Sequence, residues 1–118
     1  CAACGHRWPA PAVMAPADPC LACGRPATRP DVVWFGETPH HMGRIARALQ
    51  ATDLFVAIGT SGTVYPAAGF AAAARTAGAS TLELNLEPGR NAGVFDAARH
   101  GPASEIVPEW VAEVLAER

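Results

Sequence analysis

Apolar residues fall in short runs that predict alternating strands and helices after about residue 30. Leu54–Ile58 is a continuously apolar run, which is the pattern of a strand buried on both faces of a parallel sheet. Thr81–Asn85 is the next predicted strand. Val32–Phe35 is a shorter apolar, β-branched and aromatic run that predicts a strand or an extended segment.

The first predicted helix lies between the apolar runs Val32–Phe35 and Leu54–Ile58. Its evidence is the recurrence of Met42, Ile45 and Leu49 at helical spacing. We expect it to begin at Thr38-Pro39, with Thr at the N-cap and Pro in the first turn, and to end near Ala51.

Two further helices are predicted in the second half of the chain. The Ala-rich segment Pro66–Ala77 predicts one helix, with Gly78 as the residue that ends it. A last helix is predicted over about Pro108–Ala116, with a buried stripe made by Val107, Trp110, Val111, Val114 and Leu115.

The first 23 residues contain all the cysteines, in a C-x2-C-x15-C-x2-C pattern formed by Cys1, Cys4, Cys20 and Cys23. This spacing is typical of a zinc ribbon, in which two tight turns present four thiolates to one ion. We therefore expect one structural Zn²⁺ with no open ligand position. Two disulfides are a weaker alternative, because the other 95 residues contain no cysteine and read as an intracellular α/β domain. A redox C-x-x-C pair is also disfavoured, because that motif normally occurs once, at a strand-to-helix junction.

The fold class predicted from this order of elements is α/β. Strands that alternate with helices imply parallel β-α-β connections. The chain reads as the C-terminal part of a Rossmann-like parallel sheet (residues 31–118) with an attached small zinc-ribbon module (residues 1–30). Only two or three strands are present, and the chain starts with Cys1, so we expect a fragment of a longer protein.

The charge balance excludes some classes of partner. The 118 residues carry nine basic residues, all of them Arg, and eleven acidic residues, for a net charge of −2. This leaves no basic surplus for nucleic acid and no polybasic run for a membrane surface. With no apolar run of about 20 residues and no visible signal peptide, we expect a cytoplasmic protein.

Two loops that follow predicted strands are candidates for a nucleotide site. In an open parallel sheet, ligands bind beyond the carboxyl ends of the strands. Gly59-Thr60-Ser61-Gly62 offers small side chains and hydroxyls, and Asn85-Leu86-Glu87 offers a carboxylate suited to ribose hydroxyls. His40-His41 are expected to be solvated, and His100 is expected in a loop without an acidic partner.

Taken together and in order, these motifs resemble the C-terminal half of the sirtuins, and in particular the class III branch of bacterial and mitochondrial deacylases. The resemblance covers essentially the whole chain. It rests on the upstream cysteines and on four further motifs, which are Val32-Val33-Trp34-Phe35-Gly36-Glu37, Gly59 to Phe70, Glu83-Leu84-Asn85-Leu86-Glu87 and Gly101-Pro102-Ala103.

The resemblance implies an NAD-dependent protein-lysine deacylase or deacetylase, a transferase that releases nicotinamide and O-acyl-ADP-ribose. It implies that Gly59, Thr60 and Ser61 contact NAD, that Asn85, Leu86 and Glu87 contact its adenosine ribose, and that Ala103 contacts the adenine end. It further implies that the segment Val32, Val33, Trp34, Phe35, Gly36 and Glu37 pairs with the acyl-lysine peptide as an added strand.

Three motifs of the family are not found in these 118 residues, namely the first Gly-Ala-Gly NAD loop, Gln-Asn-x-Asp and the catalytic His-Gly. We therefore expect the isolated chain to be inactive. The main alternative is a non-catalytic zinc-ribbon interaction module joined to a partial nucleotide-binding fold. A different Rossmann enzyme is a weaker alternative, because Gly59-Thr60-Ser61-Gly62 lacks the glycine pattern that such enzymes need.

Overall fold

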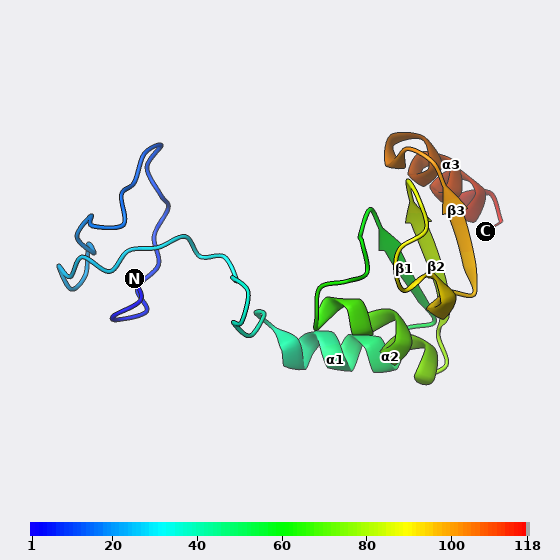
Figure 1. Cartoon of the computed structure of the whole chain (residues 1–118), viewed down its shortest axis with the longest axis horizontal. Coiled ribbons are helices and arrows are strands. Elements are labelled where there is room, and N and C mark those ends of the chain that lie inside the picture. Colours follow the sequence, from blue (N-terminus) through cyan, green and yellow to red (C-terminus); the bar gives the residue numbers. More distant parts are fainter. Residues whose placement is uncertain (118) are drawn as a thin grey trace. The chain divides into compact units, whose positions relative to one another are not determined.

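The chain forms two compact units, shown in a computed structural model that describes residues 1–117. The first unit is Cys1–His40 and the second begins at His41 (Figure 1). Residues 31–40, which the sequence pattern assigned to the α/β part, therefore belong to the same compact unit as the cysteines.

The described residues 1–40 contain turns and extended chain but neither helix nor strand. Each C-x2-C pair closes a turn, with the N–H of Gly5 donating to Cys1 O at 2.9 Å and the N–H of Gly24 donating to Cys20 O at 2.8 Å. Both glycines have positive φ, 74° and 70°, a conformation that other residues adopt at a cost. These turns place the cysteine side chains without help from a sheet or helix.

The run Val32–Phe35 forms no strand in this unit, so only the extended alternative of the prediction holds. The segment ends in a turn, in which the N–H of Glu37 donates to Trp34 O at 3.1 Å. An apolar run becomes a strand only when a second strand supplies hydrogen-bond partners, and the described residues 1–40 offer none.

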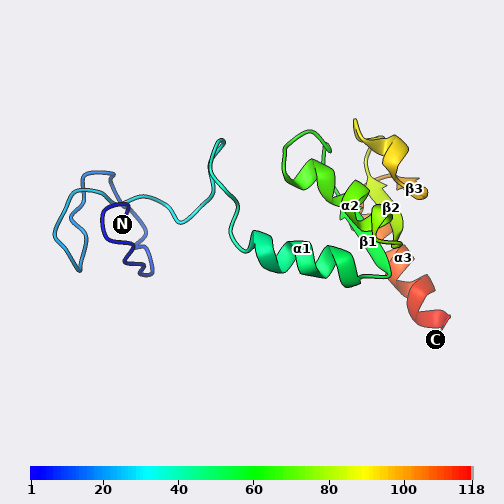
Figure 2. The same ribbon diagram turned by 90° about the horizontal axis from the view of Figure 1, so that it is seen from below.

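The second unit is a three-stranded parallel sheet with helices, as the sequence predicted. The strands lie in the order β1-β2-β3, and they are β1 (Leu54–Ile58), β2 (Ser80–Asn85) and β3 (Ala97–His100). The other elements are α1 (Met42–Ala51), η1 (Ala67–Gly69), α2 (Phe70–Thr76), η2 (Ala92–Val94) and α3 (Ala103–Ala116). Figures 1 and 2 show α3 on the opposite side of the sheet from α1 and α2.

The core of this unit lies around β2. Leu84 is fully buried, and the small side chains of Ala71 and Ala74 are buried on α2, which packs against β1 and β2. Burial on both faces was predicted for Leu54–Ile58 and is wrong at its ends: Leu54 is 44% and Ile58 48% exposed. The reason is that β1 lies at the edge of the described sheet.

Strand β3 was not predicted, since Ala97–His100 has neither an apolar run nor β-branched residues. It forms because β2 offers a free line of backbone donors and acceptors, and the two strands pair from Leu82↔Ala97 to Asn85↔His100.

The helix beginnings also differ from the prediction. Helix α1 begins at Met42 rather than at Thr38-Pro39, and His41 precedes it in a left-handed conformation with φ of 61°. The 310 turn η1 replaces the first part of the predicted helix Pro66–Ala77. Gly78 follows α2 with φ of 100° and ends it as expected.

Helix α3 begins at Ala103, and Pro108 lies inside it. Proline lacks an N–H and crowds the carbonyl four residues earlier, which is why the sequence pattern placed it at a helix start. The predicted stripe is partly wrong: Val111 and Leu115 are exposed, and the half-buried side chains are those of Ile106, Val107, Trp110 and Val114. In the part of the chain that the structure describes, none of the helices has the length and apolar character to cross a membrane.

Candidate functional site

The four cysteine thiols converge in the first unit. Their sulfur atoms all lie within 4.8 Å of one another, with Cys1 Sγ 3.8 Å from Cys23 Sγ and Cys4 Sγ 3.8 Å from Cys20 Sγ. A tetrahedral ion with Zn–S bonds of about 2.3 Å requires sulfur–sulfur edges of about 3.8 Å. A disulfide requires about 2.05 Å, so the two-disulfide alternative is not formed and the cluster fits Zn²⁺.

The backbone around the second cysteine pair favours a thiolate. The pKa of Cys20 is lowered to about 7 because the N–H of Cys23, and then that of Ala22, donate to its sulfur, and these contacts outweigh burial. At Cys4 the N–H of His6 lowers the pKa, but the Cys23 thiol, burial and Cys20 together raise it. Four thiolates this close need a cation between them, and a shell of four sulfurs leaves no open position for chemistry.

The aromatic residues after the first pair do not join the cluster. His6 stacks on Trp8, with ring centroids 5.4 Å apart and planes inclined by 19°. The cluster of potential ligands found in residues 1–117 consists of cysteines alone, as expected for a site that needs no fifth ligand.

The candidate nucleotide loops of the second unit meet at one edge of the sheet. The strands are parallel, with Ile58 opposite Leu84 and Asn85 opposite His100, so all three carboxyl ends lie together. The loop after β1 contains the predicted Gly59, Thr60 and Ser61, and the loop after β2 contains Leu86 and Glu87. The third loop leads to the predicted Ala103, which is the first residue of α3. The structure therefore brings together all the residues that the resemblance assigns to NAD.

Hydrogen bonds tie the loop after β1 to the segment after β2. Asn85 Nδ2 donates to Thr60 O at 2.7 Å, and the backbone N–H of Arg90 donates to Ser61 O at 3.1 Å. The Oγ atoms of Ser61 and Thr63 lie 2.9 Å apart. Asn85 thus has a positioning role that its predicted contact with ribose did not include.

Asn91 lies close to Gly62 in the loop after β1 and is bonded to η1, and sequence reasoning missed it. Its Nδ2 donates to Ala68 O at 3.2 Å. A Cβ atom at Gly62 would lie 1.8 Å from Asn91 Oδ1, and Gly62 has φ of 65°. Only glycine meets both conditions. No local pattern around Asn91 marks this role, because it depends on a turn about 30 residues earlier in the chain.

A buried carboxylate lies beneath this edge. Glu83 in β2 is 1% exposed, and its Oε1 accepts the N–H of Gly89 at 2.9 Å. Its Oε2 lies 3.5 Å from His100 Nε2. The expectation that His100 sits in a loop without an acidic partner is therefore wrong, since the unpredicted strand β3 places it opposite β2. His40 is exposed, as expected, and its Nε2 lies 3.4 Å from Asp31 Oδ1.

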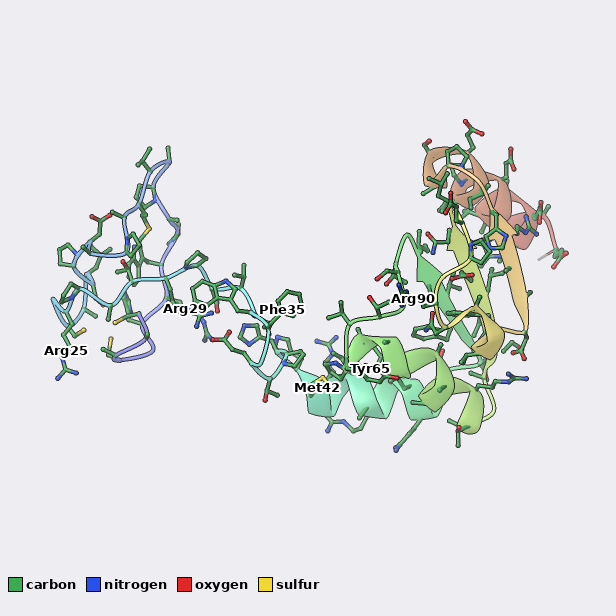
Figure 3. The ribbon with its side chains drawn as sticks, in the orientation of Figure 1. Arg25, Arg29, Phe35, Met42, Tyr65 and Arg90 are labelled. Carbon is green, nitrogen blue, oxygen red and sulfur yellow. The ribbon has the colours of Figure 1, made fainter. Side chains whose placement is uncertain are left out.

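The predicted substrate segment Val32–Glu37 lies in the first unit and presents aromatic side chains to solvent. Trp34 is 52% and Phe35 91% exposed, and Figure 3 shows the Phe35 ring pointing away from the chain. Large exposed apolar side chains in one segment are typical of a surface that binds a partner. Beside the segment lies a cavity of about 550 Å³, lined in part by Trp8, Met14, Val32 and Val33.

A family model, a sequence relative and solved structures all match this chain to the Sir2 family. The model of the Sir2 family matches residues 1–66. An NAD-dependent protein deacylase of Caulobacter vibrioides is 55% identical over 117 residues, which are 98% of this chain and 49% of the relative.

Two solved structures share the fold. A Sir2 homologue in complex with NAD has a TM-score of 0.78 and 32% identity, over 86% of this chain and 40% of that protein. A Sir2 protein bound to a myristoylated histone peptide has a TM-score of 0.70 and 33% identity, over 86% of this chain and 45% of that protein. The chain thus spans less than half the length of each of these relatives, and with more than half of its residues matched by the family model it belongs to the Sir2 family.

Proposed function

We propose that the protein containing this chain is an NAD-dependent protein-lysine deacylase. Acyl-lysine, NAD and water would give free lysine, nicotinamide and O-acyl-ADP-ribose. The observation that carries the proposal is the convergence of Gly59–Gly62, Asn85–Glu87 and Ala103 at one carboxyl edge of a parallel sheet, where this class of fold binds nucleotides.

The nucleotide would lie against the loops of this edge. Gly59, Thr60 and Ser61 offer small, exposed residues that allow close approach of a pyrophosphate to the backbone. Asn85, Leu86 and Glu87 would contact the adenosine ribose, with the exposed carboxylate of Glu87 able to accept hydrogen bonds from its hydroxyls. Ala103 would contact the adenine end. The homologue solved with NAD supports this assignment.

The acyl-lysine peptide would add to the Val32–Glu37 segment as a strand. The exposure of Trp34 and Phe35 supports this role, as does the related structure solved with a myristoylated histone peptide. One Zn²⁺ on Cys1, Cys4, Cys20 and Cys23 would brace the unit that carries this segment.

The test compares two proteins, the 118-residue chain and a protein of full family length that contains it. Each is incubated with an acetyl-lysine peptide with and without NAD, and nicotinamide and O-acyl-ADP-ribose are measured by mass spectrometry. We expect NAD-dependent turnover by the longer protein only, since the resemblance places the catalytic His and the first NAD loop outside these residues.

Two results would contradict this expectation, and the second would also contradict the deacylase proposal itself. Turnover by the 118-residue chain alone would show that the isolated chain is active. Failure of the longer protein to turn over, together with no nucleotide preference in calorimetry, would favour the interaction-module alternative.

A further inference from the structure

Arg29 lies at the centre of the loop that carries the predicted substrate segment. Its Nη1 and Nη2 bind Glu37 Oε1 and Oε2 at 2.5 and 2.9 Å, and Nη2 also donates to Val32 O at 2.9 Å. The guanidinium lies over the Trp34 ring, 3.9 Å from its centroid. One side chain therefore contacts the beginning, middle and end of the segment Val32–Glu37.

The partner of Arg29 also contacts the backbone of the segment. Glu37 Oε2 accepts the N–H of Trp34 at 3.0 Å. The pKa of Glu37 is lowered to about 2, first by its hydrogen bonds to Arg29 and then by the Trp34 N–H. The carboxylate is consequently ionised throughout the neutral range. A forked pair of this kind fixes direction as well as distance, which a lysine ammonium cannot do.

The backbone before Arg29 is anchored to the cysteine module. Thr28 is buried, and its hydroxyl lies 3.2 Å from both Ala15 O and Asp18 O. Ala27 O accepts the N–H of Ala2, which follows the first cysteine, at 2.8 Å. The backbone before Arg29 is therefore held by the cysteine module, and the bonds of the Arg29 guanidinium hold the substrate segment in place relative to that module.

The hydrogen bonds within the segment alternate along the chain. Val32 O and the N–H and C=O of Trp34 are used inside the loop. Within residues 1–117, the backbone groups of Val33 and Phe35 make no hydrogen bond. In the extended part of the segment, residues 32–34, successive residues direct these groups to opposite edges. One edge is therefore held by Arg29 and Glu37, and the Val33 groups on the other edge are left for a partner strand. Phe35 lies in the turn that follows, and its backbone groups are unbonded as well.

We propose that Arg29 is a positioning residue for the acyl-lysine peptide: through Glu37, Val32 and Trp34 it holds the segment so that the backbone groups of Val33 and Phe35 face the incoming chain. This inference rests on the proposed deacylase function and adds to it a residue that acts through its neighbours in the segment. The hydrogen bonds and the cation–π contact of Arg29 all lie within the cysteine-containing unit, so the proposal predicts an effect on peptide binding and none on NAD binding.

The test is steady-state kinetics on the full-length protein with Arg29→Lys, which keeps the charge and removes the fork. Loss of charge-assisted hydrogen bonds is expected to raise KM for the acyl-lysine peptide by about tenfold or more. KM for NAD and kcat at saturating peptide are expected to stay within about twofold of the wild type. Glu37→Gln should produce the same pattern.

The matched control is Arg99→Lys, since Arg99 makes a forked ion pair with Glu113 in the second unit. It should leave both KM values unchanged. Zinc content and melting temperature of each variant separate a misfolded protein from a folded one with a displaced segment. If Arg29→Lys is folded and has an unchanged peptide KM, or raises both KM values equally, the proposal is wrong.

A wild type that does not turn over would refute the deacylase function without deciding the role of Arg29. Calorimetric binding of the acetyl-lysine peptide then decides it. Weakening by about tenfold or more in Arg29→Lys supports the proposal, whereas equal binding, or no binding to the wild type, overturns it.

Discussion

The two units of this chain are stabilised in different ways. In the second unit, Leu84, Ala71 and Ala74 are buried between a parallel sheet and its helices. In the first, the only residues below a tenth exposed are Cys20 and Thr28, and order comes from turns, four thiolates and the Arg29–Glu37 pair. Apolar burial stabilises one unit, whereas the other has specific polar contacts and a four-cysteine cluster that fits a metal ion.

Because they are stabilised differently, the two units are expected to unfold separately. Apolar burial is spread over many residues, so the loss of one contact weakens a core in proportion. A metal site is cooperative, because all its ligands are released when the ion leaves.

Removal of zinc should unfold the first unit and leave the second folded. Binding free energies of structural Zn²⁺ sites are about 10–16 kcal/mol, far more than the few polar contacts of residues 1–40 can replace. We expect Cys20→Ser in the full-length protein to abolish zinc binding and to remove hydrogen-exchange protection from residues 1–40 only. Ala3→Ser, a non-ligand in the first turn, is the control. Equal loss of protection in both units would contradict the contrast.

Truncation of a side chain in the core of the second unit should destabilise that unit and leave zinc binding by the first unit unchanged. Leu84→Ala removes a fully buried side chain from the central strand and should destabilise the protein by about 2–5 kcal/mol. The control, Leu86→Ala, is 65% exposed and should change stability by less than about 0.5 kcal/mol. Urea denaturation followed by circular dichroism measures both. Loss of zinc from the Leu84→Ala variant would show that the two units do not unfold independently.

Crowding of the nucleotide loop should affect the second unit locally. Gly62→Ala places a Cβ against Asn91 at a positive φ and should cost about 1–3 kcal/mol in strain, with weaker NAD binding in calorimetry. Gly93→Ala, at a glycine with open space around it, is the control. The added substitution Asn91→Ala should restore part of the affinity, because it removes the steric clash. A lack of any rescue would show that backbone strain alone is responsible.

The Arg29–Glu37 pair gives the smallest effect and a defined pH dependence. The pKa of Glu37 in the folded chain, about 2, lies below its ordinary value of 4.5. Its stabilising contribution is therefore complete above about pH 4.5 and is lost as pH falls toward 2. The melting temperatures of the wild type and Glu37→Gln should differ by a constant amount from pH 7 to pH 5. A difference that already narrows across that range would contradict the assignment.

Much of the fold could be predicted from local pattern. The apolar run Leu54–Ile58 and the run at Thr81–Asn85 are strands, and Gly78 ends a helix, because burial and turn chemistry leave a trace in a few adjacent residues. Strand β3 and the start of α3 could not be predicted in this way. One depends on a free edge of β2, and the other on a tolerated internal Pro108.

The candidate site shows the same division. The four cysteines and the two loops after β1 and β2 were predicted, Ala103 was given by the family resemblance, and the structure brings the cysteines together and places the loops at one edge of the sheet. Asn91, Glu83 and Arg29 were not predicted, since each acts through a partner outside its own local pattern. Polar residues in loops have many possible roles, and only the position of the partner selects one.

The cysteine cluster and the family could be inferred from the chain alone, because cysteine spacing and the order of motifs are local properties of the sequence. The folded structure was needed to show that Asn91 excludes a side chain at Gly62, that Glu83 faces His100 and that Arg29 holds the segment Val32–Glu37. Each of these contacts depends on distances between atoms that the backbone path sets. Those distances cannot be predicted from residue type or from the order of neighbouring residues.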